Sequence, residues 1–203
     1  MSSPMPLSTK IAHVAAIEAG AAKAFVKPDA HLANALASTA KNDMPPIQVS
    51  ALQGQLLAIQ ARFVGAKTVL EIGALGGYST ICLSKTGAKV TSIEIDAKHR
   101  DVASENLRAA GIEPDIILGR RAGGAPEARE RGQGLTRKNG CIFVDNVIQE
   151  LITCHDGSVG EGTLVAKAGA DTRVTATLVP KITGKEGVVD NAFIDGFVIA
   201  IVN

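Results

Sequence analysis

The sequence is poor in aromatic residues and has almost no net charge. Aromatic side chains make up 3% of the 203 residues, with no Trp and one Tyr, so we expect no surface on which nucleobases stack. Lys and Arg number 21 against 20 Asp and Glu, which leaves no basic field for a polyanion. Both deficits argue against nucleic acid as a substrate or partner.

Cysteine and long apolar runs are scarce as well. Cys82, Cys141 and Cys154 show no spacing typical of a zinc site or a disulfide framework. No apolar run approaches the roughly 20 residues of a membrane-spanning helix. The N-terminus also lacks the apolar core and cleavage signature of a secretory signal. We therefore expect no membrane partner and a cytoplasmic location.

A glycine-rich turn is the most informative feature that the sequence does contain. The segment Val69-Leu70-Glu71-Ile72-Gly73-Ala74-Leu75-Gly76-Gly77-Tyr78-Ser79-Thr80 runs from an apolar stretch through glycines to a helix start. A second acid, Glu94, ends the next apolar run. An acid about 20 residues past such a turn is placed to bind ribose hydroxyls. The layout predicts a nucleoside site, although a tight strand-to-helix turn in any α/β domain would also use glycine.

The spacing of the glycines indicates which nucleoside is bound. Dinucleotide sites use G-x-G-x-x-G, whereas this chain has Gly73-x-x-Gly76-Gly77. The carboxylate of Glu71 beside the turn would repel a pyrophosphate but attract an ammonium or a sulfonium group. These residues favour S-adenosylmethionine over NAD, and an NAD oxidoreductase is disfavoured.

Periodicity after residue 67 predicts a β-α-β-α-β segment with a parallel sheet. The expected strands are 68–72, 89–95 and 115–119, and the expected helices are 78–86 and 97–110, the second capped by Asp96. Runs at 174–179 and 193–202 predict a terminal antiparallel pair, and the Gly-rich stretch 149–171 is interpreted as a loop. Three helices are expected before the first strand, at about 8–21, 28–40 and 50–63.

On these motifs the chain resembles the class I S-adenosylmethionine-dependent O-methyltransferases of the catechol and caffeoyl-CoA type. The matching stretches are 45–57, 69–80, 91–96, 140–147 and 195–200. The resemblance implies a Rossmann-like α/β methyltransferase fold, with a mostly parallel sheet and a C-terminal antiparallel pair. It also implies an N-terminal helical cover over 1–43, a methyltransferase domain over 44–203, and a small catechol-like or phenolic substrate.

The resemblance also assigns site residues. The positions that match the S-adenosylmethionine site are Glu71, Gly73, Gly77, Tyr78, Ser79 and, for the ribose, Glu94. Asp145 and Asn146 match two protein ligands of a magnesium ion, although a strand-end turn would favour the same residue types. No catalytic base can be named. The N-terminal helices help to form dimers in the family, so a homodimer is considered, and packing alone is the alternative.

Residues 120–139 depart from the family pattern. They are crowded with Arg and Gly and contain no apolar run, so they predict no buried strand and at most a short polar helix around 126–131. The family has a strand and a helix here, together with a third metal ligand. We therefore expect the sheet to be one strand short and the metal site to be incomplete. Substitution of the missing ligand by His155 or Asp156 is considered but disfavoured.

Our hypothesis for residues 120–139 is a deletion junction or a displaced splice or reading frame. An alternative function follows from it: a catalytically impaired paralogue or isoform that binds the methyl donor or dimerises with an intact partner.

Overall fold

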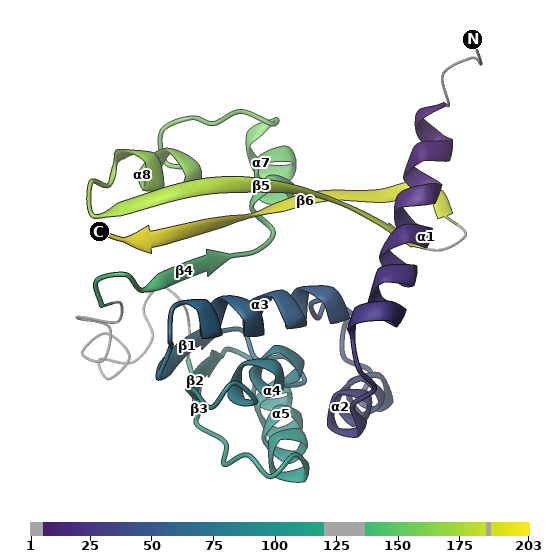
Figure 1. The fold of residues 1–203 in the computed structure, drawn as a ribbon, viewed down its shortest axis with the longest axis vertical. Coiled ribbons are helices and arrows are strands. Elements are labelled where there is room, and N and C mark those ends of the chain that lie inside the picture. Colours follow the sequence, from purple (N-terminus) through teal and green to yellow (C-terminus); the bar gives the residue numbers. More distant parts are fainter. Residues whose placement is uncertain (1–5, 120–136, 186–187) are drawn as a thin grey trace. The chain divides into compact units, whose positions relative to one another are not determined.

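The computed structural model describes residues 6–119, 137–185 and 188–203 (Figure 1). The predicted strand deficit and the predicted polar helix at 126–131 lie outside the described residues, as does the atypical segment up to residue 136. The chain divides into two compact units, Val26–Leu135 and Met1–Phe25 together with Thr136–Asn203. Each unit is described by itself. The domain boundary at residues 43/44 stays a prediction.

In its described residues, the unit Val26–Leu135 is a three-stranded parallel sheet with helices. Its elements are α2 (Ala30–Lys41), α3 (Ala51–Phe63), β1 (Thr68–Ile72), α4 (Tyr78–Ser84), β2 (Lys89–Glu94), α5 (Ala97–Ala109) and β3 (Ile116–Leu118). The strand order is β1-β2-β3, and both pairings are parallel. The predicted β-α-β-α-β segment is therefore confirmed.

Side-chain caps begin α2, α3 and α5, and the cap at Asp96 confirms a prediction from the sequence. Asp29 accepts hydrogen bonds from the backbone N–H groups of the first turn of α2, and Asp96 does the same for α5. Ser50 and Gln53 form a reciprocal capping box at the start of α3. The helices then pack on the sheet through two small apolar clusters, Ala35–Ile81–Leu107 and Ala61–Leu83–Val90.

The second unit is antiparallel. It comprises α1 (Leu7–Phe25), β4 (Cys141–Val144), α7 (Val147–His155), α8 (Leu164–Ala170), β5 (Val174–Lys185) and β6 (Val188–Val202). The strand order is β4-β6-β5, with both pairings antiparallel. The predicted terminal pair is confirmed, and Figure 1 shows it as two long strands. None of the helices in the described part of the chain is long and apolar enough to cross a membrane.

The prediction of a loop over 149–171 is wrong, because α7 and α8 occupy much of it. Val147 and Leu151 lie four positions apart on α7 and are buried against Val198 of β6. Gly196 permits this packing, since a Cβ there would lie 2.6 Å from the Ile148 side chain and 2.7 Å from the Val179 carbonyl oxygen. The glycine content of the stretch concealed a short apolar period that only the sheet could bury.

Candidate functional site

The turn after β1 depends on backbone conformations that favour glycine. Gly73 has φ 89° and Gly77 has φ 80°, both in the left-handed region. Leu75 lies between them with φ 47°, an uncommon value for a residue with a side chain. The Gly73 N–H donates to the Ile93 carbonyl oxygen at 2.8 Å, which ties the start of the turn to β2. Two of the predicted site residues, Gly73 and Gly77, thus shape this turn.

Gly76 is held by two helices that the sequence analysis did not connect to the turn. A Cβ on Gly76 would lie 2.0 Å from Thr39 Oγ1 of α2, so no other residue fits without movement. Asn106 of α5 donates from Nδ2 to the Gly76 carbonyl oxygen at 2.9 Å. Asn106 Oδ1 in turn accepts from Asn34 Nδ2 at 3.2 Å. No local signal in the sequence marks Thr39 or Asn106 as supports of the turn.

Glu94 and the glycine turn lie side by side and are joined by a hydrogen bond. The Glu94 carboxylate accepts the Leu75 N–H at 2.8 Å, the Ile95 N–H at 2.7 Å and the Asp96 N–H at 3.1 Å. The residue is 4% exposed. Its two oxygens offer about four lone-pair sites, so a fourth hydrogen bond remains available to a ligand hydroxyl. The Leu75–Glu94 hydrogen bond therefore brings the carboxylate at the end of β2 and the backbone of the turn after β1 into one site.

Glu71 links β1, α4 and β2 through three hydroxyl groups. Its Oε1 accepts from Ser79 Oγ at 2.5 Å, and its Oε2 accepts from Thr80 Oγ1 at 2.5 Å and Ser92 Oγ at 2.7 Å. Burial raises the pKa of Glu71, while the three hydrogen bonds oppose the rise and the nearby Glu94 adds to it. Ser79, another predicted site residue, thus donates its hydroxyl hydrogen bond to this carboxylate.

The Tyr78 side chain lies in the apolar interior. The residue is 6% exposed, and a Cβ on Gly54 of α3 would lie 3.1 Å from Tyr78 Cε1. Burial raises the pKa of its phenol. Tyr78 therefore packs the start of α4 against α3, which holds the turn from a third side.

A second group of polar side chains lies where β4 ends. Asn146 begins α7 with φ 62° and is exposed, and its side chain makes no capping hydrogen bond to the helix. Asp195 of β6 supplies a cap instead, because its Oδ1 accepts the Gln149 N–H at 3.2 Å. Lys181 Nζ lies 3.7 Å from Asp145 Oδ1 and 3.9 Å from Asp195 Oδ2.

These residues do not fit a magnesium ion, which prefers six oxygen ligands in a near-octahedral arrangement. Asp145 and Asn146 offer two oxygen-bearing side chains, and an ammonium already lies beside the first. Within the described ranges, no three His, Cys, Asp or Glu side chains gather where they could hold one metal ion. The substitutes considered, His155 and Asp156, lie at the far end of the nine-residue helix α7, about 13 Å from its start.

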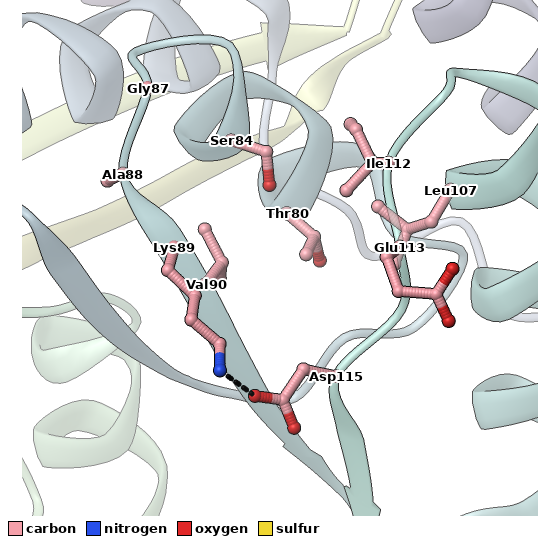
Figure 2. Close-up of a pocket in the computed structure, with 10 residues that line it drawn as sticks. All are labelled: Thr80, Ser84, Gly87, Ala88, Lys89, Val90, Leu107, Ile112, Glu113 and Asp115. Atoms are coloured by element: carbon pink, nitrogen blue, oxygen red, sulfur yellow. Dashed lines mark ion pairs between the residues drawn. The ribbon is translucent and has the colours of Figure 1, made fainter.

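The described cavity lies elsewhere. Figure 2 shows it at the start of β2, with lining residues from α4, α5, β2 and the segment before β3. The volume of the cavity is about 290 Å³. Lys89 Nζ and Asp115 Oδ2 form an ion pair at its edge, 3.6 Å apart. Ligands of open α/β sheets bind beyond the carboxyl ends of the strands, whereas this cavity adjoins the amino end of β2. It is therefore distinct from the Glu94 site.

Comparison with known proteins identifies the family. Residues 23–159 match the model of the O-methyltransferase family. The chain is also 33% identical over 201 residues to a catechol O-methyltransferase from Niastella koreensis, covering 81% of this chain and 86% of that protein. The chain belongs to the O-methyltransferase family. The predicted class, an S-adenosylmethionine-dependent O-methyltransferase of the catechol and caffeoyl-CoA type, is thereby confirmed.

Solved structures of O-methyltransferases share the fold. One is an O-methyltransferase from Streptomyces achromogenes, in complex with S-adenosylmethionine, with a TM-score of 0.75 and 26% identity over 98% of this chain and 100% of that one. Another is an O-methyltransferase from Bacillus cereus, in complex with S-adenosylhomocysteine, with a TM-score of 0.76 and 26% identity over 95% and 100% of the two chains. The predicted Rossmann-like methyltransferase fold is confirmed for this O-methyltransferase.

Proposed function

We propose that this O-methyltransferase transfers the methyl group of S-adenosylmethionine to a hydroxyl oxygen of a small phenolic or catechol-like molecule. The observation that carries the donor part is the hydrogen bond from the Leu75 N–H to the Glu94 carboxylate. It joins the glycine turn and the strand-end acid into one site. The name of the Niastella koreensis relative, a catechol O-methyltransferase, supports the acceptor class.

The residues divide the work of holding the donor. The remaining acceptor site of Glu94 suits a ribose hydroxyl, and the turn at Gly73 and Gly77 lets the backbone approach the methionine half without a Cβ in the way. Glu71 and Ser79 add negative charge and polarity near this half, where a sulfonium and an ammonium must be accommodated. Tyr78 supports the turn through packing.

The reaction itself is an in-line displacement. An oxygen lone pair of the acceptor forms the new bond to the methyl carbon while the bond from that carbon to sulfur breaks, and sulfur keeps the bonding pair. The acceptor hydroxyl loses its proton. Holding donor and acceptor at the correct separation and angle supplies most of the rate enhancement in such a step. A homodimer and a cytoplasmic location stay predictions. Magnesium assistance at Asp145 and Asn146 also stays a prediction, and the described side chains around these two residues do not favour it.

Calorimetric titration with S-adenosylmethionine tests the donor site. We expect the wild type to bind and E94Q to bind about ten- to hundredfold more weakly, because a hydrogen bond to a charged group contributes roughly 1.5–3 kcal/mol. E113Q is the matched control: it neutralises an exposed glutamate at the other end of the sheet and should bind like the wild type. Equal affinity of E94Q and the wild type would overturn the assignment.

Methylation of a panel of catechols and simple phenols, followed by mass spectrometry, tests the acceptor class. The expected product gains one methyl group per turnover. Donor binding without methylation of any panel member would instead support the second candidate, an impaired donor-binding or dimerising form. The incomplete oxygen ligand set at Asp145 and Asn146 is the observation that keeps this candidate in view.

A further inference from the structure

Three charged side chains from three neighbouring strands meet at the end of β4. Lys181 of β5 pairs directly with Asp195 of β6 in the strand register, and Asp145 follows the last residue of β4. The Lys181 ammonium lies within ion-pair distance of both carboxylates, 3.7 Å from Asp145 Oδ1 and 3.9 Å from Asp195 Oδ2. One cation thus serves two anions.

Asp195 makes this arrangement necessary. It is 0% exposed, and its Oδ1 accepts the Gln149 N–H at the start of α7. Within the described part of the chain, its Oδ2 has no hydrogen-bond partner. A buried carboxylate is costly unless a partner compensates its charge. The Lys181 ammonium is the described cation that does so.

We propose that Lys181 is a built-in cation at the position beside Asp145 that a divalent metal ion would otherwise take, and that it excludes such an ion. A divalent cation bonded to Asp145 at about 2.1 Å would lie close to the ammonium and repel it. Displacing Lys181 would in turn leave Asp195 buried without its counter-ion. Both effects oppose metal binding, because one positive charge already lies between the two carboxylates at the end of β4.

This inference uses Asp145 as the metal ligand that the family resemblance predicts, but its test does not depend on the proposed methyl transfer. The readout is metal binding, which is measured by titration with Mn²⁺. This ion is paramagnetic and substitutes for Mg²⁺. Loss of the free-ion signal in electron paramagnetic resonance reports binding. A chain that fails to bind S-adenosylmethionine would still give a clear result here.

The experiment compares the wild type with K181M and K181Q, which remove the ammonium, and with K89M. Lys89 is the matched control, because it forms an ion pair of similar length with Asp115 but is shared with no second carboxylate. We expect the wild type and K89M to show no stoichiometric site at millimolar Mn²⁺. K181M and K181Q should gain one site, at least tenfold tighter than any wild-type binding, that the additional change D145N removes.

Two results would overturn the proposal. One is a stoichiometric Mn²⁺ site in the wild type that D145N abolishes, because Lys181 would then not exclude the ion. The other is folded K181M and K181Q, verified by circular dichroism, without any gain in Mn²⁺ binding. If both variants fail to fold, the wild type and D145N alone decide: no D145N-sensitive site supports the proposal, and such a site overturns it.

Discussion

The two units of the molecule stabilise buried carboxylates in different ways. In the parallel unit, Glu71 accepts hydrogen bonds from three hydroxyls and Glu94 from three backbone N–H groups. In the antiparallel unit, Asp195 accepts one backbone N–H and lies beside the Lys181 ammonium. The hydrogen bonds to the first two acids come from uncharged donors, with the His99 imidazole 3.9 Å from Glu94 Oε1, whereas the Lys181 ammonium lies beside the third acid.

The difference indicates which ligand charge each group of carboxylates can accommodate. The hydrogen bonds to Glu71 and Glu94 come from uncharged hydroxyl and backbone N–H donors, so the region stays attractive to a cationic ligand such as a sulfonium amino acid. Lys181 already supplies one positive charge beside the carboxylates of Asp195 and Asp145. We therefore expect a cationic methyl donor to bind near Glu71 and Glu94. We expect no further cation beside Asp145 and Asp195.

Removing the Lys181 ammonium should have the largest effect on the free energy of unfolding. We expect K181M to lower the free energy of unfolding by about 2–3 kcal/mol, because it leaves Asp195 buried and uncompensated. Urea denaturation with EDTA present measures the change. K89M, which removes an ion pair whose lysine side chain is 73% exposed, should cost less than about 1 kcal/mol. Equal losses in the two variants would contradict the special role of Lys181.

A steric change at the turn should have an intermediate effect. We expect G76A to destabilise the protein by about 1–3 kcal/mol, the usual range for overpacking, because the new Cβ would lie 2.0 Å from Thr39 Oγ1. Thermal unfolding measures the loss. In the double variant G76A/T39A the clashing oxygen is absent, so the added cost of G76A should shrink.

G119A is the control for this change, because a Cβ on Gly119 would meet no atom of the described residues within 4 Å. It should leave the unfolding temperature nearly unchanged. An unchanged unfolding temperature in G76A as well would show that α2 does not confine the turn.

The smallest expected effect is a pH dependence that belongs to Glu71. Burial raises the pKa of Glu71 above its ordinary value of 4.5. The folded state therefore holds a proton that the unfolded state has already released, and stability falls as the pH rises from about 4.5 toward the folded-state pKa. E71Q has no such proton to lose. The free energy of unfolding of the wild type relative to E71Q should therefore decrease with rising pH in that window.

Urea denaturation at several pH values checks this sign. E113Q again serves as the control, because Glu113 is exposed. A wild-type stability that keeps a constant offset from E71Q across the window would show that burial does not hold the proton on Glu71.

Much of the fold was readable from the sequence, because its signals are local. The alternating strands and helices from residue 68 to 118, and the cap at Asp96, follow from periodicity and capping chemistry over a few residues. The same holds for the glycine turn and for the acid that ends β2. The helices within 149–171 were missed, because their apolar periods are short and several glycines lie between the two helices.

The sequence by itself determined which residues form the turn and which acid stands about 20 residues beyond it, since both depend on neighbours along the chain. Only the tertiary structure decided that Thr39 and Asn106 confine Gly76, and that Lys181 lies between Asp145 and Asp195. The physical reason is that steric exclusion and charge compensation act across space. Strand register and helix packing, rather than spacing in the sequence, bring these partners together.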